Sequence, residues 1–519
     1  MNRGGDFDMG VSLKIDSYTV DSLIEDFKTG RVAIPEFQRG YVWKERKAPQ
    51  LLDSLYRNFP IDSILLWRSP LDVESRPGAP RRNNSESSSW LIDGQQRTRT
   101  LEKIVHGDIR VVFHPGDDVF QLESAATKKT PGWYYVSEIF GDSSYRELRA
   151  RIQIENNSDQ IKEKFHRVRN ILNYRIPAVR MEGHSFDEAV DAFQRINTMG
   201  MRLRKEDIQS AKVAARHNKF ISTEVIPYAD DLRGRGYGRL STLQLFMVCA
   251  FIAKPDARNQ TRLHELESTE LRKAWAQTKN ATDQVIDILR GELSLLNMDV
   301  LWSANLLVPL IAVCHRMDRK TRNVDEMVGW LSLAALRHRY SSASETALEQ
   351  DLKACREKDP IGSLLANLRQ GGKTLEALPS DFSGAMADKN GLLAMFIACK
   401  YRDIRDLHDG VRITSAMKLN KHHLLPRAQF MENVRHEADC IANMAFTSEA
   451  TNKSINMMSP DVYLSKLDSG VIESQCIPVN PDLWRISHAK NFWSHRRKLL
   501  ADAFNEHVKQ RMPRRRLGF

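Results

Sequence analysis

Hydrophobic positions recur along this chain at spacings that change from one stretch to the next. Near the N-terminus, Val20–Phe27 and Pro49–Arg57 carry apolar side chains at helical spacing, and Ile64–Trp67 is a short apolar run typical of a buried strand. Trp90–Ile92 is a second run of this kind, and Thr98–Val105 returns to the helical pattern. The N-terminal region is therefore predicted to mix strands with helices.

Between about Leu240 and Lys400 the pattern is almost entirely helical. The clearest segments are Ser241–Phe251, Val285–Leu296, Ser303–Cys314 and Glu326–Leu336. Gly371-Gly372-Lys373-Thr374 resembles the end of a phosphate-binding loop, but Asn367 occupies the place of its first glycine and no apolar strand precedes it. We interpret that string as a linker. We interpret the whole middle region as a helical bundle that joins the N-terminal and C-terminal functional regions.

Composition narrows the class of protein. A chain of 519 residues with 41% hydrophobic and 28% charged residues is typical of two to four soluble globular domains. The net charge of +11 favours a polyanionic partner, although a soluble protein that is merely basic is an alternative. The last stretch, 481–519, carries ten Lys or Arg against three Asp or Glu.

Cysteine usage and the N-terminal sequence bear on the compartment. The six cysteines are Cys249, Cys314, Cys355, Cys399, Cys440 and Cys476. No two of them form a C-x-x-C pair, which argues against a zinc ribbon or a disulfide framework. The first residues lack the apolar core of a signal peptide, and no apolar run approaches the ~18 residues of a membrane span. We expect a cytoplasmic protein without membrane contact.

The strongest chemical signal lies near the C-terminus, in Lys421-His422-His423-Leu424-Leu425-Pro426, followed by Asn443 and Asn452-Lys453-Ser454. One-metal hydrolysis of a phosphodiester needs a neutral imidazole to deprotonate water and a cation on the scissile phosphate. We assign His423 as the base and Asn443 as the group that orients it. His422 and Asn452 are the metal ligands, for Mg²⁺ or another divalent ion. The alternative is that these histidines and asparagines lie on a surface by chance.

Two local elements are expected to complete this site. A strand at Cys440–Ala442 would precede Asn443, and a helix would carry Asn452, so that both ends of the segment return to one point.

A second motif, Asp93-Gly94-Gln95-Gln96-Arg97, follows the predicted strand Trp90–Ile92 and begins a helix. Gly94 stands where the backbone must turn sharply, and a helix N-terminus is a ready anion site. The alternative is an ordinary Asp-Gly turn whose arginine only caps the helix.

Residues 415–467 resemble an HNH (ββα-metal) endonuclease domain of the branch found in GmrSD-type, modification-dependent restriction proteins. The resemblance implies the same roles for His423, His422 and Asn452. Two departures stand out, because His422 replaces a common Asp and Ala442 replaces a common Gly.

The N-terminal half resembles the partner domain of the same family, which is itself similar to ParB/sulfiredoxin-type nucleotide-binding folds. The matching pieces are Ile34-Pro35, Phe37-Gln38-Arg39, Asp93-Gly94-Gln95-Gln96-Arg97 and Phe193-Gln194-Arg195-Ile196-Asn197, with Gly200 and Leu203. This resemblance implies binding or hydrolysis of a nucleoside triphosphate, GTP or ATP. Arg39, Arg97 and Arg195 would place three cations on a polyphosphate, and Asp93 would hold either Mg²⁺ or a ribose.

Basic residues near the C-terminus are the remaining candidates for contact with DNA. They are Arg496, Arg497, Lys498, Arg514, Arg515 and Arg516. Trp493, which lies among them, is interpreted as a core residue.

The sequence therefore predicts an α+β, predominantly helical fold with three domains. These are a ParB-like α/β nucleotide-binding sensor over 1–235, a helical linking domain over 236–400, and an HNH endonuclease domain with a basic tail over 401–519. The predicted function is a metal-dependent DNA endonuclease of a restriction system, regulated by nucleotide and by DNA modification. Its expected partners are modified or phage DNA, a nucleoside triphosphate and a second copy in a homodimer. The alternatives are a nucleotide-binding DNA sensor whose HNH segment is inactive, and an NTPase that acts on something other than DNA.

Overall fold

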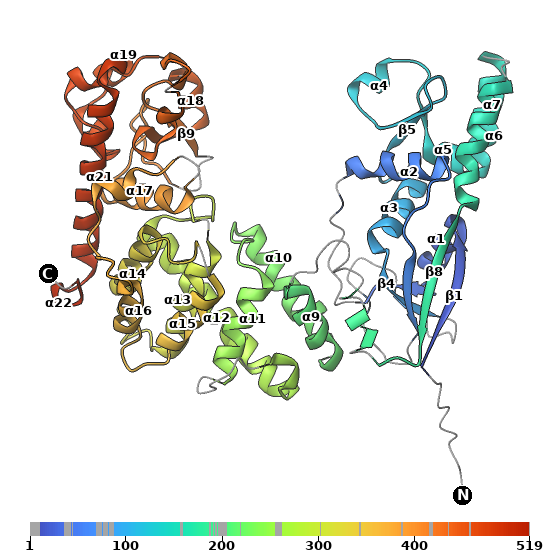
Figure 1. Cartoon of the computed structure of the whole chain (residues 1–519), viewed down its shortest axis with the longest axis horizontal. Helices are drawn as coiled ribbons and strands as arrows, with labels where there is room; N and C mark the ends of the chain where they lie inside the picture. Colours follow the sequence, from blue (N-terminus) through green and yellow to red (C-terminus); the bar gives the residue numbers. More distant parts are fainter. Residues whose placement is uncertain are drawn as a thin grey trace, which may run out of the picture. The chain divides into compact units, whose positions relative to one another are not determined.

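The computed structural model describes residues 11–517, except for 36–42, 44, 69–74, 76–80, 83–87, 156–158, 186–187, 190, 193–194, 196–204, 218, 255–261, 302, 342–343, 386–387, 415–418, 434 and 456–457. At 151–155, 205–208, 211 and 215 it describes the backbone alone. The chain divides into two compact units, Met1–Ile226 and Pro227–Phe519. The predicted fold class, α+β and mainly helical, is confirmed (Figure 1).

The N-terminal unit is built on a five-stranded mixed sheet. Its strand order is β1 (Ser12–Thr19), β8 (Arg175–Glu182), β3 (Ile64–Arg68), β4 (Ser89–Asp93) and β2 (Val32–Ala33). Strand β3 runs parallel to β8 and antiparallel to β4. The predicted strands at 64–67 and 90–92 are therefore confirmed, whereas the sequence reading missed β1, which has a mostly exposed face.

Helices and a small second sheet complete this unit. The helices are α1 (Val20–Lys28), α2 (Ala48–Tyr56), α3 (Gln95–His106), α4 (Ala125–Lys129), α5 (Val136–Phe140), α6 (Asp142–Glu155), α7 (Asp159–Arg169) and α9 (Lys205–Arg216). The second sheet has the order β6 (Val119–Leu122), β5 (Val111–His114) and β7 (Tyr134–Tyr135). Helix α1 begins where the Thr19 side chain accepts a hydrogen bond from the backbone of Ser22, and it buries its apolar face in the core.

The C-terminal unit begins with a bundle of helices. They are α10 (Ile226–Gly234), α11 (Thr242–Ala253), α12 (Ser268–Leu293), α13 (Leu307–Arg316), α14 (Val324–Leu336), α15 (Ser344–Ala354), α16 (Pro360–Arg369) and α17 (Lys389–Tyr401). The four helices predicted in this region are present, and Val285–Leu296 is the end of the longer α12. Gly371 and Gly372 have positive φ angles and form a turn directly after α16. The Gly371–Thr374 string therefore follows a helix and not the strand that precedes a phosphate-binding loop.

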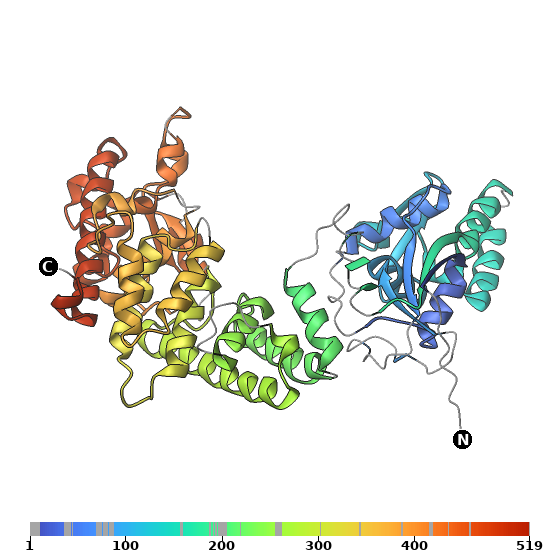
Figure 2. The same ribbon diagram turned by 60° about the horizontal axis from the view of Figure 1, so that its bottom comes forward.

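The rest of the C-terminal unit carries two short strands and a long final helix. The elements are β9 (Asn420–His423), β10 (Met444–Thr447), α18 (Glu449–Ile455), α19 (Pro460–Tyr463), α20 (Ser469–Ser474), α21 (Ala489–Arg511) and α22 (Arg514–Leu517). Helix α21 packs against α14 and α17, beside which it runs in both views (Figures 1 and 2). The predicted strand at Cys440–Ala442 is wrong, because Ile441–Asn443 is a 3₁₀ helix and the strand begins after it.

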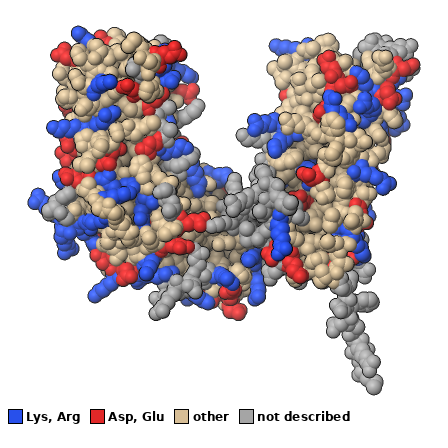
Figure 3. Space-filling model, in the orientation of Figure 1, with Lys and Arg blue, Asp and Glu red and all other residues tan. Residues whose placement is uncertain are grey.

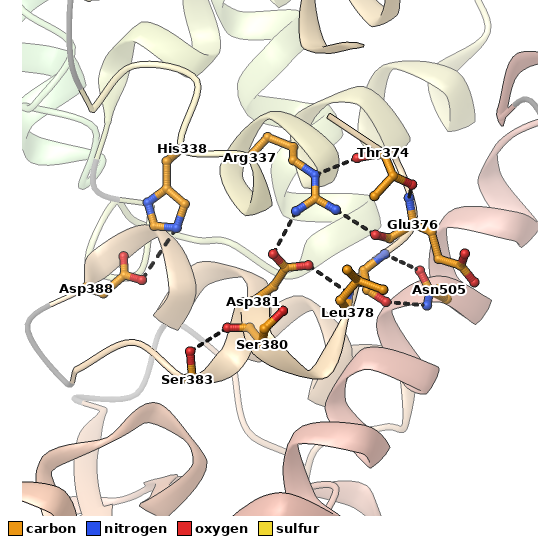
Figure 4. A network of polar contacts seen from close by, with 11 residues as sticks. Arg337, His338, Thr374, Glu376, Leu378, Ser380, Asp381, Ser383, Asp388 and Asn505 are labelled. Carbon is orange, nitrogen blue, oxygen red and sulfur yellow. Dashed lines mark hydrogen bonds and ion pairs between the residues drawn. The ribbon is translucent and has the colours of Figure 1, made fainter. Parts of the chain in front are cut away.

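A network of polar contacts fixes the segment that leads into α17 (Figure 4). The Arg337 guanidinium donates to the backbone carbonyls of Thr374 and Glu376, and it pairs with Asp381 at 2.8 Å. Asn505 on α21 bonds both backbone groups of Ala377. The loop between α16 and α17 is therefore held rigidly against both α14 and α21.

Among the helices that the structure describes, none combines the length and the apolar character that crossing a lipid bilayer requires.

Candidate active site

The two predicted catalytic segments meet in a strand pair followed by a helix. Strands β9 and β10 are antiparallel, with His423 opposite Met444 and His422 opposite Ala445. The chain then enters α18, whose start is fixed because Asp406 accepts from the backbone N–H of Ser448 at 2.7 Å and from the Thr451 hydroxyl. This arrangement brings Asn452 back to the histidines, as the spacing predicted.

His422 lies on the buried side of β9, where its side chain meets Asn452. Its Nδ1 is 3.1 Å from Asn452 Oδ1, and the ring is only 3% exposed. Burial lowers the pKa of His422, and the nearby charge of His423 adds to the effect, so the imidazole is favoured in its neutral, metal-binding form. Its Nε2 is buried and has no hydrogen-bond partner among the residues that the structure describes.

His423 lies on the opposite side of the strand and is held by a carboxylate. Its Nε2 is 2.9 Å from Asp439 Oδ1, while the other oxygen of Asp439 accepts from Nε of Arg427 at 3.0 Å. The side chain of His423 is 24% exposed, so water can reach it. A carboxylate on one ring nitrogen leaves the lone pair of the other nitrogen available to take a proton.

Asn443 does not orient His423, and this predicted role is wrong. The Asn443 side chain is fully buried, and its bonds within the described part of the chain go to backbone groups: Oδ1 accepts from Leu425 N, and Nδ2 donates to the carbonyls of Leu425 and Ala438, all at 2.9 Å. Asn443 therefore closes the loop between β9 and β10, and it acts on the site by shaping the backbone that carries Asp439.

The donor atoms present fit one weakly held divalent cation. Two ligands at about 2.1 Å on adjacent corners of an octahedron lie about 3 Å apart, which matches the 3.1 Å between His422 and Asn452. Within the described residues there is no group of three His, Cys, Asp or Glu side chains placed to hold a metal. A cation at this position would complete its shell with water and phosphate oxygens.

Sequence reasoning missed Asp439, Arg427 and Asp406. Asp439 lies 16 residues after His423, in a loop where no regular period links a side chain to the strand. A carboxylate between the histidine pair and Asn443 was the available signal, but several acidic residues share that interval.

Two of the predicted DNA contacts are structural. Arg496 is fully buried and donates to the carbonyls of Ala442 and Gln475, so it braces the nuclease segment from α21. Arg516 pairs with Glu326 at 2.9 Å and Asp359 at 2.7 Å. Among the other candidates, Arg497 is half-buried, whereas Lys498, Arg514 and Arg515 are exposed.

The second motif has the predicted strand–turn–helix form. Asp93 ends β4, and Gly94, with φ of 95°, precedes α3. A side chain at Gly94 would place its Cβ 2.5 Å from Ile64 Cγ2, so only glycine fits the turn against β3. Gln95 is buried, and Gln96 Oε1 accepts from the backbone of Trp43 at 3.1 Å.

Arg97 faces the protein in this structure. It donates to the backbone carbonyls of Asp62 and Ser63 and lies 3.6 Å from Asp93 Oδ2. Burial lowers the pKa of Arg97. Arg195 is an exposed helical residue, while Arg39 and Asn197 lie outside the described residues. The structure therefore places Asp93–Arg97 in one turn and helix start. It does not test whether Arg39, Arg195 and Asn197 join them in a pocket.

Comparison with known proteins identifies the N-terminal part of the chain. Residues 20–214 match the sequence model described as "GmrSD restriction endonuclease, N-terminal domain". These residues therefore belong to the GmrSD N-terminal domain family. A protein of Methanocaldococcus jannaschii, described as "Uncharacterized protein MJ0686", is 20% identical over 527 aligned residues, which cover 88% of each chain. That similarity extends well beyond the N-terminal domain into the part that carries β9, β10 and α18.

Proposed function

We propose that this chain is a DNA endonuclease of a restriction-type defence system, which hydrolyses phosphodiester bonds at His423. The GmrSD N-terminal domain supports the restriction function, and the β9–β10–α18 segment supports the chemistry. The observation that carries the proposal is the pairing of His423 with Asp439 on one side of β9 and of His422 with Asn452 on the other.

In the proposed mechanism, His423 removes a proton from the attacking water. Asp439 holds the imidazole in the required tautomer and stabilises the positive charge that the ring gains. His422 and Asn452 would hold Mg²⁺ or another divalent ion, which would offset the charge that develops on the phosphate and the leaving oxygen. Arg427 keeps Asp439 in place through its second oxygen.

A plasmid cleavage assay tests this proposal. Supercoiled plasmid and modified phage DNA are incubated with the wild-type chain and divalent metal, with and without GTP or ATP. His423→Ala should abolish cutting while leaving DNA affinity nearly unchanged, because the base acts on the chemical step. A chelator should stop cutting, and a His423→Ala chain that cuts normally would rule out the assigned base. One site per chain makes a nick the expected product, and double-strand cutting would then require a homodimer.

We also propose that the turn between β4 and α3 binds a nucleoside triphosphate that regulates cutting. The close approach of backbone at Gly94, the start of α3 and the Asp93 carboxylate are the features that support it. Because Arg97 is engaged with the backbone before β3, we assign it the role of holding this turn together.

Nucleotide affinity of two variants tests the pocket. Asp93→Ala should weaken GTP or ATP binding about tenfold or more if the carboxylate contacts the ligand or its Mg²⁺. Glu147→Ala, an exposed carboxylate on α6, is the matched control and should bind as wild type does. Equal affinity of both variants and wild type would contradict the pocket. The rival function, a DNA sensor without cleavage, would show nucleotide and DNA binding but no cutting.

A further inference from the structure

The C-terminal unit contains an open polar cavity of about 630 Å³ outside the residues assigned to catalysis. The start of α17, the end of α14 and the segments before α11 and α13 surround it. Its charged lining residues are Arg239, His338, Asp388 and Lys389. The amides of Gln244, Asn305 and Asn390 also line it. Such a lining offers several hydrogen-bond donors to a ligand with many acceptor oxygens.

Asp388 is the one carboxylate among these lining residues, and both of its oxygens already have partners. Asp388 Oδ1 accepts from the backbone N–H groups of Asn390 and Gly391, which cap α17, and Oδ2 lies 3.5 Å from His338 Nε2. Figure 4 shows His338 and Asp388 side by side at the start of α17. Asp388 contributes one negative charge to the lining against the two positive charges of Arg239 and Lys389, so these three residues give the cavity a net positive charge.

Lys389 is placed where a cation is costly. It is the first residue of α17, the end at which the helix dipole is positive. Partial loss of surrounding water lowers the pKa of Lys389, and the charges of Arg239 and Lys421 lower it further. Arg239 and Lys389 therefore place two positive charges in one cavity, and the charge of Lys421 on β9 acts on Lys389 from outside it. Neighbouring like charges of this kind are typical of sites that receive a polyanion.

The third cation connects the cavity to the candidate active site. Lys421 lies on β9, two residues before His423, so both side chains lie on the same face of that strand. Ile441 N donates to the carbonyl of Gly384 at 2.9 Å, which ties the segment before α17 to the segment before β10. Phe396 on α17 and Phe446 on β10 also pack edge to face, with their ring centroids 5.5 Å apart. The cavity and His423 are thus parts of one packed structure.

We propose that Arg239, Lys389 and Lys421 form a path for the phosphodiester backbone of a DNA strand, which runs from the cavity to His423. This inference rests on the proposed nuclease function and adds the surface that holds DNA beside the cut. A DNA strand fits better than a free nucleotide, because the cavity is open and its described aromatic lining residue, Tyr340, is buried with its hydroxyl bonded to Asp351. The two units carry interspersed basic and acidic side chains on the faces visible in Figure 3, so this local cluster is more informative than the net charge.

The test compares DNA binding by full-length variants in the His423→Ala background, where cutting cannot interfere. Arg239→Gln combined with Lys389→Gln should raise the Kd for a 30-base-pair duplex about tenfold, measured by fluorescence anisotropy. The slope of log K against log salt should fall in magnitude by about 2, because each phosphate contact contributes about 0.9. Lys320→Gln combined with Lys358→Gln removes the same charge from exposed positions outside the cavity and should change the slope much less.

Each alternative outcome is informative. An unchanged salt slope in the Arg239/Lys389 variant, or equal slopes in the two double variants, would overturn the DNA path. Loss of GTP or ATP affinity without loss of DNA affinity would also overturn it, because the cavity would then bind a free nucleotide. The nuclease proposal is tested separately, by the plasmid cleavage assay with the wild-type chain. A chain that binds DNA through this cavity but never cuts would contradict that proposal and leave the DNA path standing.

Discussion

The Asp439 carboxylate lies 2.9 Å from Nε2 of His423 and comes from the loop between β9 and β10 rather than from either strand. The loop is itself held by Asn443, which bonds the backbone of Leu425 and Ala438 at its two ends. The orientation of the proposed base therefore depends on a carboxylate, and the position of the carboxylate depends on a buried amide. These two dependences can be separated by mutation.

Asp439→Asn is expected to reduce the DNA cleavage rate about 100-fold or more. The amide can donate to Nε2, which would favour the ring tautomer that has no lone pair on the nitrogen facing water. DNA affinity should stay close to that of wild type, because the substitution affects the chemical step. Single-turnover cleavage and anisotropy on the same preparation measure the two quantities. Glu437→Gln, two residues away with Lys490 as its partner, is the matched control and should cut normally.

Asn443→Asp should impair the chain as severely as Asn443→Ala. If Asn443 oriented His423, an aspartate would serve that purpose and activity would survive. In the structure its Nδ2 donates to two carbonyls, so a carboxylate there would face two acceptors. Loss of about three buried hydrogen bonds predicts a destabilisation of about 3 kcal/mol. Thermal unfolding and cleavage assays on both variants would decide, and an active Asn443→Asp chain would restore the role that the sequence suggested.

Much of this site could be read from the sequence, and the failures have physical causes. The helix that carries Asn452 was predicted because the spacing of His422, His423 and Asn452 requires the chain to return to one point, and α18 contains Asn452. The start of β10 was not, since apolar residues lie on both sides of Asn443, and the first part of this segment, Ile441–Asn443, is a 3₁₀ helix whose Ile441 N–H bonds the carbonyl of Gly384. Side-chain pairing across a loop, as between His423 and Asp439, has no period that a sequence pattern could show.

The lack of a local sequence signal for tertiary contacts also explains why Arg496 was predicted to contact DNA. A solvated arginine and a buried one look identical in a basic helical pattern, because the partners of Arg496 are backbone carbonyls far away along the chain. By contrast, Ser185 and Glu188 in the N-terminal unit form a capping box that a sequence pattern can show, because the two residues are three apart and bond each other. Local signals were thus read correctly, and errors arose where tertiary contacts decide.

Arg496→Ala should lower stability without altering how DNA binding responds to salt. The substitution leaves the carbonyls of Ala442 and Gln475 without their buried donor, which predicts a loss of about 3 kcal/mol from the C-terminal unit. Lys498→Gln, on the exposed side of the same helix, is the matched comparison and should leave the melting temperature unchanged. Differential scanning calorimetry and a salt titration of DNA affinity separate the two effects. A reduced salt slope in a stably folded Arg496→Ala chain would return Arg496 to the DNA contacts.

His507 should make the C-terminal unit sensitive to acid. It is buried on α21, with Nε2 3.2 Å from the Ser332 hydroxyl on α14. Burial, with the charge of Arg511 as a second cause, lowers the pKa of His507 to about 4, against about 6.5 in an unfolded chain. Between these values the unfolded state binds more protons, so the free energy of unfolding falls as the pH drops from 6.5 towards 4. Above pH 6.5 this loss is absent, and at its greatest it is about 3 kcal/mol.

His507→Gln removes this titration while keeping a side chain that can bond Ser332. The melting temperature of the variant, measured by calorimetry from pH 7.5 to pH 4.5, should therefore fall less steeply than that of wild type below pH 6.5. His495→Gln removes an exposed histidine from the same helix and should follow the wild-type curve. Parallel curves for His507→Gln and wild type would mean that the His507 imidazole takes up its proton at the same pH in the folded and the unfolded chain. The contact between α14 and α21 would then not be the acid-sensitive point of the unit.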